Sequence, residues 1–289
     1  MNFSYVALVF SCCLVLVSAI EDGLMKISPE QTSEMERKAD LYYEYNKEER
    51  NQDVGPDFKR LHTMYPCIAG MQPIGADTDL DGHKFTCGIQ NIVGAPIVYS
   101  FGSFGVQGFE GELLKVRPDA KIFIYEIMGE ERLPPKEKRD PRITYIPIGL
   151  GGVKDEHFEI PQGSEVQSMR DLMKMNGHNY IDILKMDVEG FEFPWIKAEG
   201  DLILPNVGQF LVEVHIRRDN SMKFKMLHSM GLTRMKDDSV HFVEIAEKSG
   251  LRLFMKEPNV LNSYRCSELA FVQKSQSLWE KNKAQLKLN

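Results

Sequence analysis

From residue 91 onward, short apolar runs alternate with amphipathic stretches, and this pattern predicts an α/β domain. Each run has the length of a buried strand, and the stretches between them have helical spacing. The predicted strands occupy residues 96–101, 121–126, 143–148, 181–186, 209–215, 251–256 and 267–273. Strands that alternate with helices form a mainly parallel sheet with helices on both faces. The last two strands are close in sequence, which favours an antiparallel hairpin at the sheet edge.

Helices are expected between these strands, and weaker patterns flank them. The helices should end near 116, begin near 168, cover 191–198 and occupy parts of 219–250; residues 157–160 suggest a small hairpin. Residues 21–60 mix acidic and basic side chains and predict a solvated helical lead-in. Residues 61–90 are rich in turn residues and predict a cap with one strand at 84–87. The α/β domain therefore spans 91–275, and residues 276–289 form a polar tail.

The first twenty residues differ from the rest. Residues 6–17 are an uninterrupted apolar and small-residue run, closed by Ser18 and Ala19 before the acidic Glu21. This matches the apolar region and cleavage site of a signal peptide, although no basic residue precedes the run. The run is shorter than the ~20 residues that span a bilayer. We expect residues 1–20 to be a cleaved signal peptide and the protein to be luminal or extracellular; an uncleaved, Golgi-type signal anchor is the alternative.

Composition excludes some classes of partner. The 289 residues are 43% hydrophobic and 27% charged, which is typical of a globular protein with a large core. The net charge is −7, whereas nucleic-acid binding requires a basic surface. Nucleic acid is therefore excluded as an expected partner, and a membrane is expected only if residues 1–20 are retained. The pattern does not indicate an oligomeric state.

Five cysteines bear on the redox compartment. Cys12 and Cys13 lie in the apolar run, which leaves Cys67, Cys87 and Cys266. In an oxidising compartment, an odd number suggests one disulfide and one thiol. The pair nearest in sequence, Cys67 and Cys87, is the expected disulfide; three buried thiols are the alternative.

A glycine-containing turn follows the strand at 96–101. Gly102 and Gly105 lie in this turn, where a nucleotide-like ligand could approach the backbone closely. About twenty residues later, Glu126 ends the next strand and could accept hydrogen bonds from both ribose hydroxyls. The site could hold NAD or S-adenosylmethionine. Phe104 occupies the position where a dinucleotide fingerprint requires its second glycine, which disfavours NAD.

More acidic residues follow the two later parallel strands. Asp187 and Glu189 come directly after the strand at 181–186, although either could simply cap the next helix. Glu213 and His215 lie on one face of the strand at 209–215, because side chains alternate along a strand. All four are candidates for a catalytic base at the ligand-binding edge. They could also hold a divalent ion, but no spacing dictates one, and we predict no metal site.

Several segments together resemble a known family. The segment KMDVEGFE at 185–192 and LVEVHI at 211–216 resemble the FkbM-type methyltransferases and, more closely, the animal methyltransferase-like 24 group and its invertebrate relatives. Three more segments share the resemblance: VYSFGSFGVQGFE at 98–110, DGHKFTC at 81–87, and LFMKEPN at 253–259 with CSEL at 266–269. The resemblance covers residues 60–273, and its most specific motif surrounds Asp187.

The resemblance implies a Rossmann-like class I methyltransferase fold that binds S-adenosylmethionine, with seven strands of which the last is antiparallel. It places Gly102 and Gly105 against the methionine part of the cofactor, Glu126 at the ribose, and Asp187 near the sulfonium and the acceptor. Ser100 departs from the pattern, because many class I enzymes have an acid at that cofactor-facing position. The related group shares the serine.

The sequence thus predicts an S-adenosylmethionine-dependent methyltransferase. Methyl transfer is an in-line displacement, so positioning and exclusion of water supply much of the acceleration. We expect O-methylation of a glycan or small molecule in the secretory pathway. A catalytically silent member that serves as a binding or scaffold protein is the first alternative, and an NAD-dependent oxidoreductase is the second.

Overall fold

The computed structural model describes residues 83–151, 160–215, 235–258 and 266–274, most of 63–75, and several helical residues between 33 and 44. The chain divides into two compact units, Met1–Lys38 and Ala39–Asn289, and the sheet belongs to the second. The expected signal segment 1–20, residues 157–159 of the hairpin predicted at 157–160 and the tail at 276–289 lie outside the described residues, as does most of the lead-in. Among the residues described, no helix is long and apolar enough to span a membrane.

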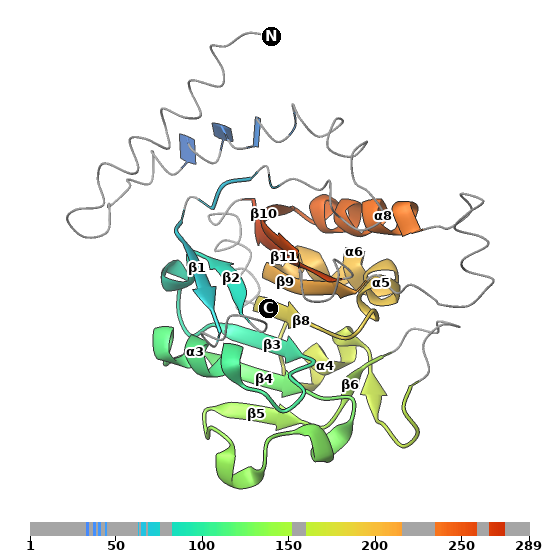
Figure 1. Ribbon diagram of the computed structural model, residues 1–289. Helices are drawn as coiled ribbons and strands as arrows, with labels where there is room; N and C mark the ends of the chain where they lie inside the picture. The colour runs from blue at the N-terminus through green and yellow to red at the C-terminus, as the bar shows by residue number, and fades with distance from the viewer. Residues whose placement is uncertain are drawn as a thin grey trace. The chain divides into compact units, whose positions relative to one another are not determined.

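A seven-stranded sheet forms the centre of the second unit (Figure 1). Its strand order is β10-β11-β9-β8-β3-β4-β5. β11 pairs antiparallel with both β10 and β9, whereas the other pairs are parallel, so β11 runs opposite to its six companions. All seven predicted strands are confirmed, with these bounds: β3 (Ile97–Phe101), β4 (Lys121–Tyr125), β5 (Ile143–Ile146), β8 (Ile181–Met186), β9 (Val207–His215), β10 (Leu251–Pro258) and β11 (Cys266–Gln273).

Helices join the strands and cover the sheet. The α-helices are α3 (Gly108–Val116), α4 (Met169–Met175), α5 (Glu192–Trp195), α6 (Asp201–Ile203) and α8 (Met235–Lys248). The helix predicted over 191–198 is instead α5, a π-helical turn at Ile196–Gly200, and α6. Gly200 lets α8 pack closely there, because a Cβ atom would lie 2.8 Å from Ile245 Cγ2. Short 3₁₀ turns occupy Ile89–Asn91, Gly129–Arg132, Lys136–Lys138 and Leu204–Asn206.

Each face of the sheet buries its own hydrophobic core, because successive side chains of a strand point to opposite faces. In β3, Tyr99 and Phe101 contribute to the core beneath α4, α5 and α8, whereas Val98 contributes to the other. That second core contains Phe109 of α3 and residues of the β1 (Met71–Ile74) and β2 (Lys84–Cys87) hairpin. The hairpin and α3 therefore cover one face, and the remaining helices cover the other. A further two-stranded pair joins β6 (Gly149–Leu150) to β7 (Val166–Gln167).

The β1–β2 hairpin was only half predicted. The strand at 84–87 is confirmed, but β1 was missed because its four residues include Pro73 and lie among turn residues. Gln209 of β9 ties the hairpin to the sheet: its side-chain amide accepts from Cys87 N and donates to Cys87 O, each at 2.8 Å. The expected disulfide between Cys67 and Cys87 is also present, and Cys266 is a buried cysteine outside any disulfide.

Removing the disulfide should destabilise the protein. The two cysteines are 20 residues apart, and a cross-link of this span stabilises by about 3 kcal/mol through the unfolded chain. We expect the double substitution Cys67→Ser and Cys87→Ser to lower the free energy of unfolding by that amount in urea titrations. Cys266→Ser, which leaves the disulfide in place, is the matched control. An unchanged urea midpoint after removal of the disulfide would contradict the prediction.

Candidate active site

The carboxyl ends of neighbouring parallel strands form the edge where the candidate residues lie. From β3 the chain moves to β4 on one side, and it later returns to β8 on the other side of β3. Such a reversal of strand order opens a ligand-binding crevice beyond the strand ends. The glycine turn follows β3, Glu126 follows β4, Asp187 follows β8, and His215 ends β9. The tertiary fold therefore brings all these sequence-predicted positions to one edge.

The two glycines of the turn are required by backbone neighbours. Gly102 has φ 76°, and a Cβ atom there would lie 1.7 Å from the carbonyl oxygen of Asp187. Gly105 has φ 79°, and its Cβ atom would lie 2.8 Å from the carbonyl oxygen of Arg132. The space that each glycine leaves is thus occupied by protein backbone. Their geometry accounts for the tight packing of the turn without a ligand.

Glu126 links the turn to the end of β4. Its carboxylate accepts the backbone N–H of Phe104 and that of Met128, each at 3.2 Å. Phe104 has φ 49°, which is unusual for a bulky side chain, and Arg132 lies 4.4 Å from its ring centroid. The Phe104 side chain is 63% exposed and that of Met128 43%, while Glu126 is buried. A buried carboxylate bordered by exposed apolar side chains is the arrangement that a nucleoside requires.

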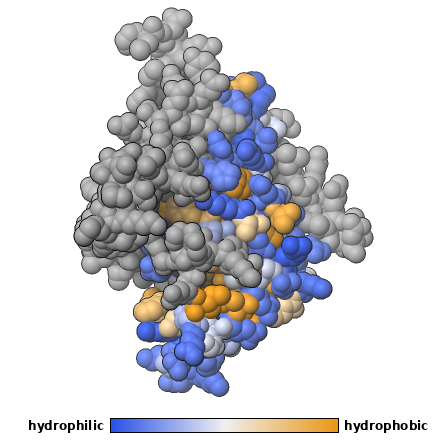
Figure 2. Space-filling model, turned by 90° about the vertical axis from the view of Figure 1, so that its right-hand side faces the viewer, coloured by the Kyte–Doolittle hydropathy of each residue, from blue (hydrophilic) through white to orange (hydrophobic). Residues whose placement is uncertain are grey.

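Figure 2 views the molecule from the side to which β3 and β4 point in Figure 1. Hydrophobic side chains lie exposed there among hydrophilic ones. This edge therefore offers both apolar and polar contacts to a ligand.

Ser100 contacts a carboxylate that the sequence analysis did not identify. Its hydroxyl donates to Glu110 Oε1 at 2.5 Å, and both residues are buried. Glu110 belongs to the first turn of α3, next to the buried Phe109. The helix thus supplies an acid beside the position where many class I methyltransferases have one on the strand. An acidic residue on the apolar stripe of a helix was the available signal.

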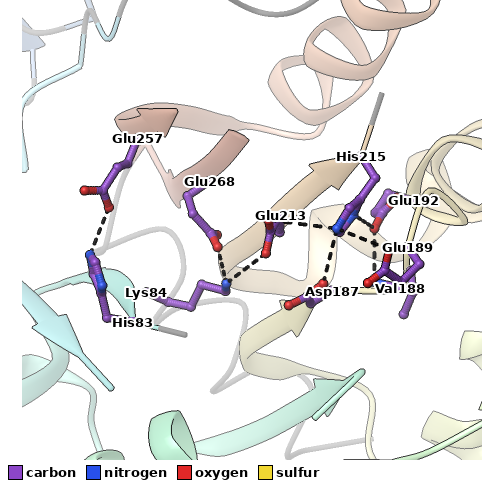
Figure 3. A network of polar contacts seen from close by, with 10 residues as sticks. All are labelled: His83, Lys84, Asp187, Val188, Glu189, Glu192, Glu213, His215, Glu257 and Glu268. Atoms are coloured by element: carbon purple, nitrogen blue, oxygen red, sulfur yellow. Dashed lines mark hydrogen bonds and ion pairs between the residues drawn. The ribbon is translucent and has the colours of Figure 1, made fainter. Parts of the chain in front are cut away.

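Asp187, Glu189, Glu213 and His215 converge, and we call these four residues the His215 cluster (Figure 3). The Nε2 atom of His215 lies 3.7 Å from Asp187 Oδ1, 3.7 Å from Glu189 Oε2 and 3.9 Å from Glu213 Oε1. Glu189 adopts φ 55°, and its side chain is 83% exposed. All four candidate bases therefore lie within one small region.

Glu192 contacts His215 of the cluster through the other ring nitrogen, and the sequence analysis missed this role. Its Oε1 atom lies 3.0 Å from His215 Nδ1 and accepts the Val188 N–H at 3.0 Å. Its side chain is fully buried. Glu192 thereby fixes the orientation of the imidazole ring. The EGFE sequence contained the signal, because it continues the acidic motif into the helix.

The β1–β2 hairpin contributes a cationic side chain to the same region. Lys84 of β2 pairs with Glu268 of β11 and lies 3.8 Å from Glu213 Oε2 (Figure 3). Burial alone would lower the pKa of Lys84, but the charges of Glu268, Asp187 and Glu213 raise it above the ordinary value. Burial raises the pKa of Glu268 to about 8. Sequence reasoning missed both residues, which come from segments distant in the chain.

The imidazole of His215 is held in its charged form. Burial alone would lower its pKa, but hydrogen bonds with Cys266 and Glu192, and the charges of Glu192 and Asp187, raise it to about 12. A protonated imidazole cannot accept another proton. This environment favours a binding or orienting role for His215 over that of a base.

Substituting Gly102 should disrupt the edge. Gly102→Ala places a methyl group against the Asp187 carbonyl at a backbone angle that L residues disfavour, so we expect a loss of at least about 2 kcal/mol in unfolding free energy. Gly111→Ala in α3 is the matched control, because its Cβ atom meets nothing within 4 Å and should stabilise the helix by about 0.5 kcal/mol. Thermal unfolding monitored by circular dichroism tests both. Equal melting temperatures for the two variants would contradict the role of Gly102.

Comparison with known proteins identifies the family. The model of a family described as "Methyltransferase domain" matches residues 23–273, which is most of the chain. No curated protein matches in sequence. Membership of the FkbM-type or methyltransferase-like 24 group stays a prediction.

Solved structures show more distant likeness. The Methanococcus jannaschii fibrillarin pre-rRNA processing protein is 11% identical, with 63% of this chain and 68% of that chain covered and a TM-score of 0.36. Aeropyrum pernix fibrillarin with bound S-adenosyl-L-methionine is 14% identical, with 62% and 66% covered and a TM-score of 0.37. An O-methyltransferase family protein from Burkholderia thailandensis is 12% identical, with 65% and 53% covered and a TM-score of 0.35.

The matches thus cover 53% to 68% of the lengths of these solved proteins. The TM-scores are low, and the assignment rests on the family model, with which the seven-stranded fold agrees. The chain belongs to the methyltransferase domain family.

Proposed function

We propose that the protein transfers a methyl group from S-adenosylmethionine to a hydroxyl oxygen of a glycan or small molecule in the secretory pathway. The observation that carries the proposal is the meeting of the glycine turn, Glu126 and Asp187 at the ends of three adjacent strands, β3, β4 and β8. This lies at the reversal of strand order, where α/β sheets bind nucleotide ligands. Membership of the methyltransferase domain family supports the same reaction.

The residues at this edge fit the cofactor. Each Glu126 oxygen already accepts one backbone N–H at 3.2 Å and retains a lone pair for a ribose hydroxyl. Phe104 and Met128 expose apolar surface beside it, which suits an adenine ring. The Ser100–Glu110 hydrogen bond joins β3 to α3, the two elements that flank the turn. Asp187 places a carboxylate near the position where the resemblance expects the positively charged sulfonium.

S-adenosylmethionine supplies an electrophilic methyl group on its sulfonium. The chain must orient the acceptor, exclude water and remove the hydroxyl proton. Asp187 and Glu213 are the carboxylates of the His215 cluster that come from adjacent strands, and they face the same imidazole. Their negative charge disfavours phosphorylated or carboxylated acceptors and suits a neutral polyhydroxyl compound.

The location in the secretory pathway has two supports. The apolar run at 6–17 resembles the core of a signal peptide. The disulfide between Cys67 and Cys87 is typical of proteins from an oxidising compartment. Both features favour an acceptor that is itself luminal or extracellular.

Glu126 should determine cofactor affinity. We expect the purified protein to bind S-adenosylmethionine and S-adenosylhomocysteine in calorimetric titrations. Glu126→Gln should weaken both by about 10-fold to 100-fold, because it removes a charged acceptor from the ribose hydroxyls. Glu131→Gln, an exposed glutamate five residues along, is the matched control and should bind like the wild type.

Other outcomes of this titration separate the alternatives. If the folded protein fails to bind S-adenosylmethionine, the proposal is contradicted and a catalytically silent scaffold protein is favoured. Binding of NAD alone would favour an oxidoreductase. Equal affinity in the Glu126→Gln variant and the wild type would place the cofactor elsewhere.

A further inference from the structure

The spacing of the His215 cluster is that of atoms around a common centre. The carboxylate oxygens of Asp187 and Glu189 are both 3.7 Å from His215 Nε2, which is too long for a hydrogen bond. The three donor atoms also lie within 4.8 Å of one another. Two bonds of about 2.1 Å to one ion place their donor atoms about 3.0–4.2 Å apart, depending on the angle. Both distances from His215 Nε2 fall within that range.

The imidazole is oriented in the manner of a metal ligand. Metal-binding histidines usually direct their second ring nitrogen to a carboxylate or carbonyl, which fixes the ring and makes the first nitrogen a better donor. His215 has this arrangement, with Nδ1 against the fully buried Glu192 and Nε2 directed at the carboxylates (Figure 3). Glu192 Oε2 is buried and has no hydrogen-bond partner among the described residues. The contacts of the Glu192 carboxylate are thus made through Oε1, with the imidazole ring and with the Val188 N–H.

Negative charge dominates the surroundings. The three carboxylates of the His215 cluster, those of Asp187, Glu189 and Glu213, outnumber the cationic side chains beside them, Lys84 and His215 (Figure 3). Lys84 is directed at Glu268 and Glu213, on the side of the cluster away from Glu189. Glu268 Oε2 is a further buried oxygen without a hydrogen-bond partner in the described part of the chain. A cation at the other side would offset the remaining charge.

We propose that Asp187, Glu189 and His215 bind a divalent first-row transition cation of the Mn²⁺ type. Two carboxylates with one neutral imidazole are donors that such an ion accepts, so the ion would displace the proton that the neighbouring carboxylates otherwise favour on His215. Glu189 is 83% exposed and Asp187 25%, so the ion can enter from solvent and retain open positions. A second set, Glu213, His215 and Cys266, would suit a softer ion, but Glu213 and Cys266 are buried.

The cation would give the edge a specific acceptor chemistry. An ion with open positions would bind a hydroxyl oxygen and lower its pKa, so that water or the neighbouring Glu213 carboxylate could take its proton. Two neighbouring hydroxyls of a polyol or catechol could occupy adjacent positions on the ion. This consequence rests on the proposed methyl transfer, whereas the ion site itself does not.

Manganese binding tests the site directly. Electron paramagnetic resonance measures the free Mn²⁺ that remains when the full protein is titrated without cofactor or acceptor. We expect one site per chain, and Glu189→Gln should weaken it by about 10-fold or more through loss of one donor. Glu131→Gln, which makes the same substitution at an exposed glutamate outside the cluster, should leave the affinity for Mn²⁺ unchanged. Cys266→Ser should weaken binding less than Glu189→Gln does, because the thiol is outside the proposed donor set and only hydrogen-bonds His215.

Three other results would overturn the proposed ion site. Absence of binding up to about 1 mM Mn²⁺ would mean that no ion offsets the negative charge of the carboxylates and that protonated His215 alone does so. An equal loss in Glu189→Gln and Glu131→Gln would indicate nonspecific attraction. A loss in Cys266→Ser with none in Glu189→Gln would assign the ion to the other donor set. Mn²⁺ binding without S-adenosylmethionine binding would sink the methyltransferase proposal and leave the ion site standing.

Discussion

The close approach of the turn after β3 to the end of β8 is the constraint on which the site depends. Gly102 lies against the carbonyl of Asp187, and Asp187 N donates to Phe101 O at 3.1 Å. This contact fixes Asp187 relative to the turn. The Phe104 N–H of the same turn donates to the Glu126 carboxylate and so fixes Glu126 as well. One packing contact therefore sets the distances among three strand ends. The glycine is needed for protein packing before any ligand enters.

The buried charges make the cap part of the site. Lys84 and Glu268 lose water on folding, and that cost is offset only while their partners remain in place. Lys84 comes from a hairpin that the Cys67–Cys87 disulfide and the Gln209 amide hold against the sheet. A change in the hairpin would thus alter the environment of Glu213. Stability of the cap and electrostatics of the edge are coupled.

The edge has two chemically different halves. Around Glu126, a buried carboxylate lies beside exposed apolar side chains, which suits a nucleoside. Around His215, carboxylates gather on one oriented imidazole, which suits a cation or a developing positive charge. Asp187 lies at their junction. This division matches a reaction that brings a sulfonium cofactor and a methyl acceptor together.

The sequence by itself determined the seven strands of the central sheet, their mainly parallel arrangement with an antiparallel edge hairpin, and the positions that reach the carboxyl edge. Hydrophobic periodicity is a local property, and strand ends follow from it directly. The roles of Glu110, Glu192, Lys84 and Glu268 were decided only by the tertiary structure, because their partners are on other elements. The same holds for Gly102, whose neighbour is a backbone oxygen 85 residues away in sequence. Local pattern places a residue on an element, whereas packing between elements selects what it contacts.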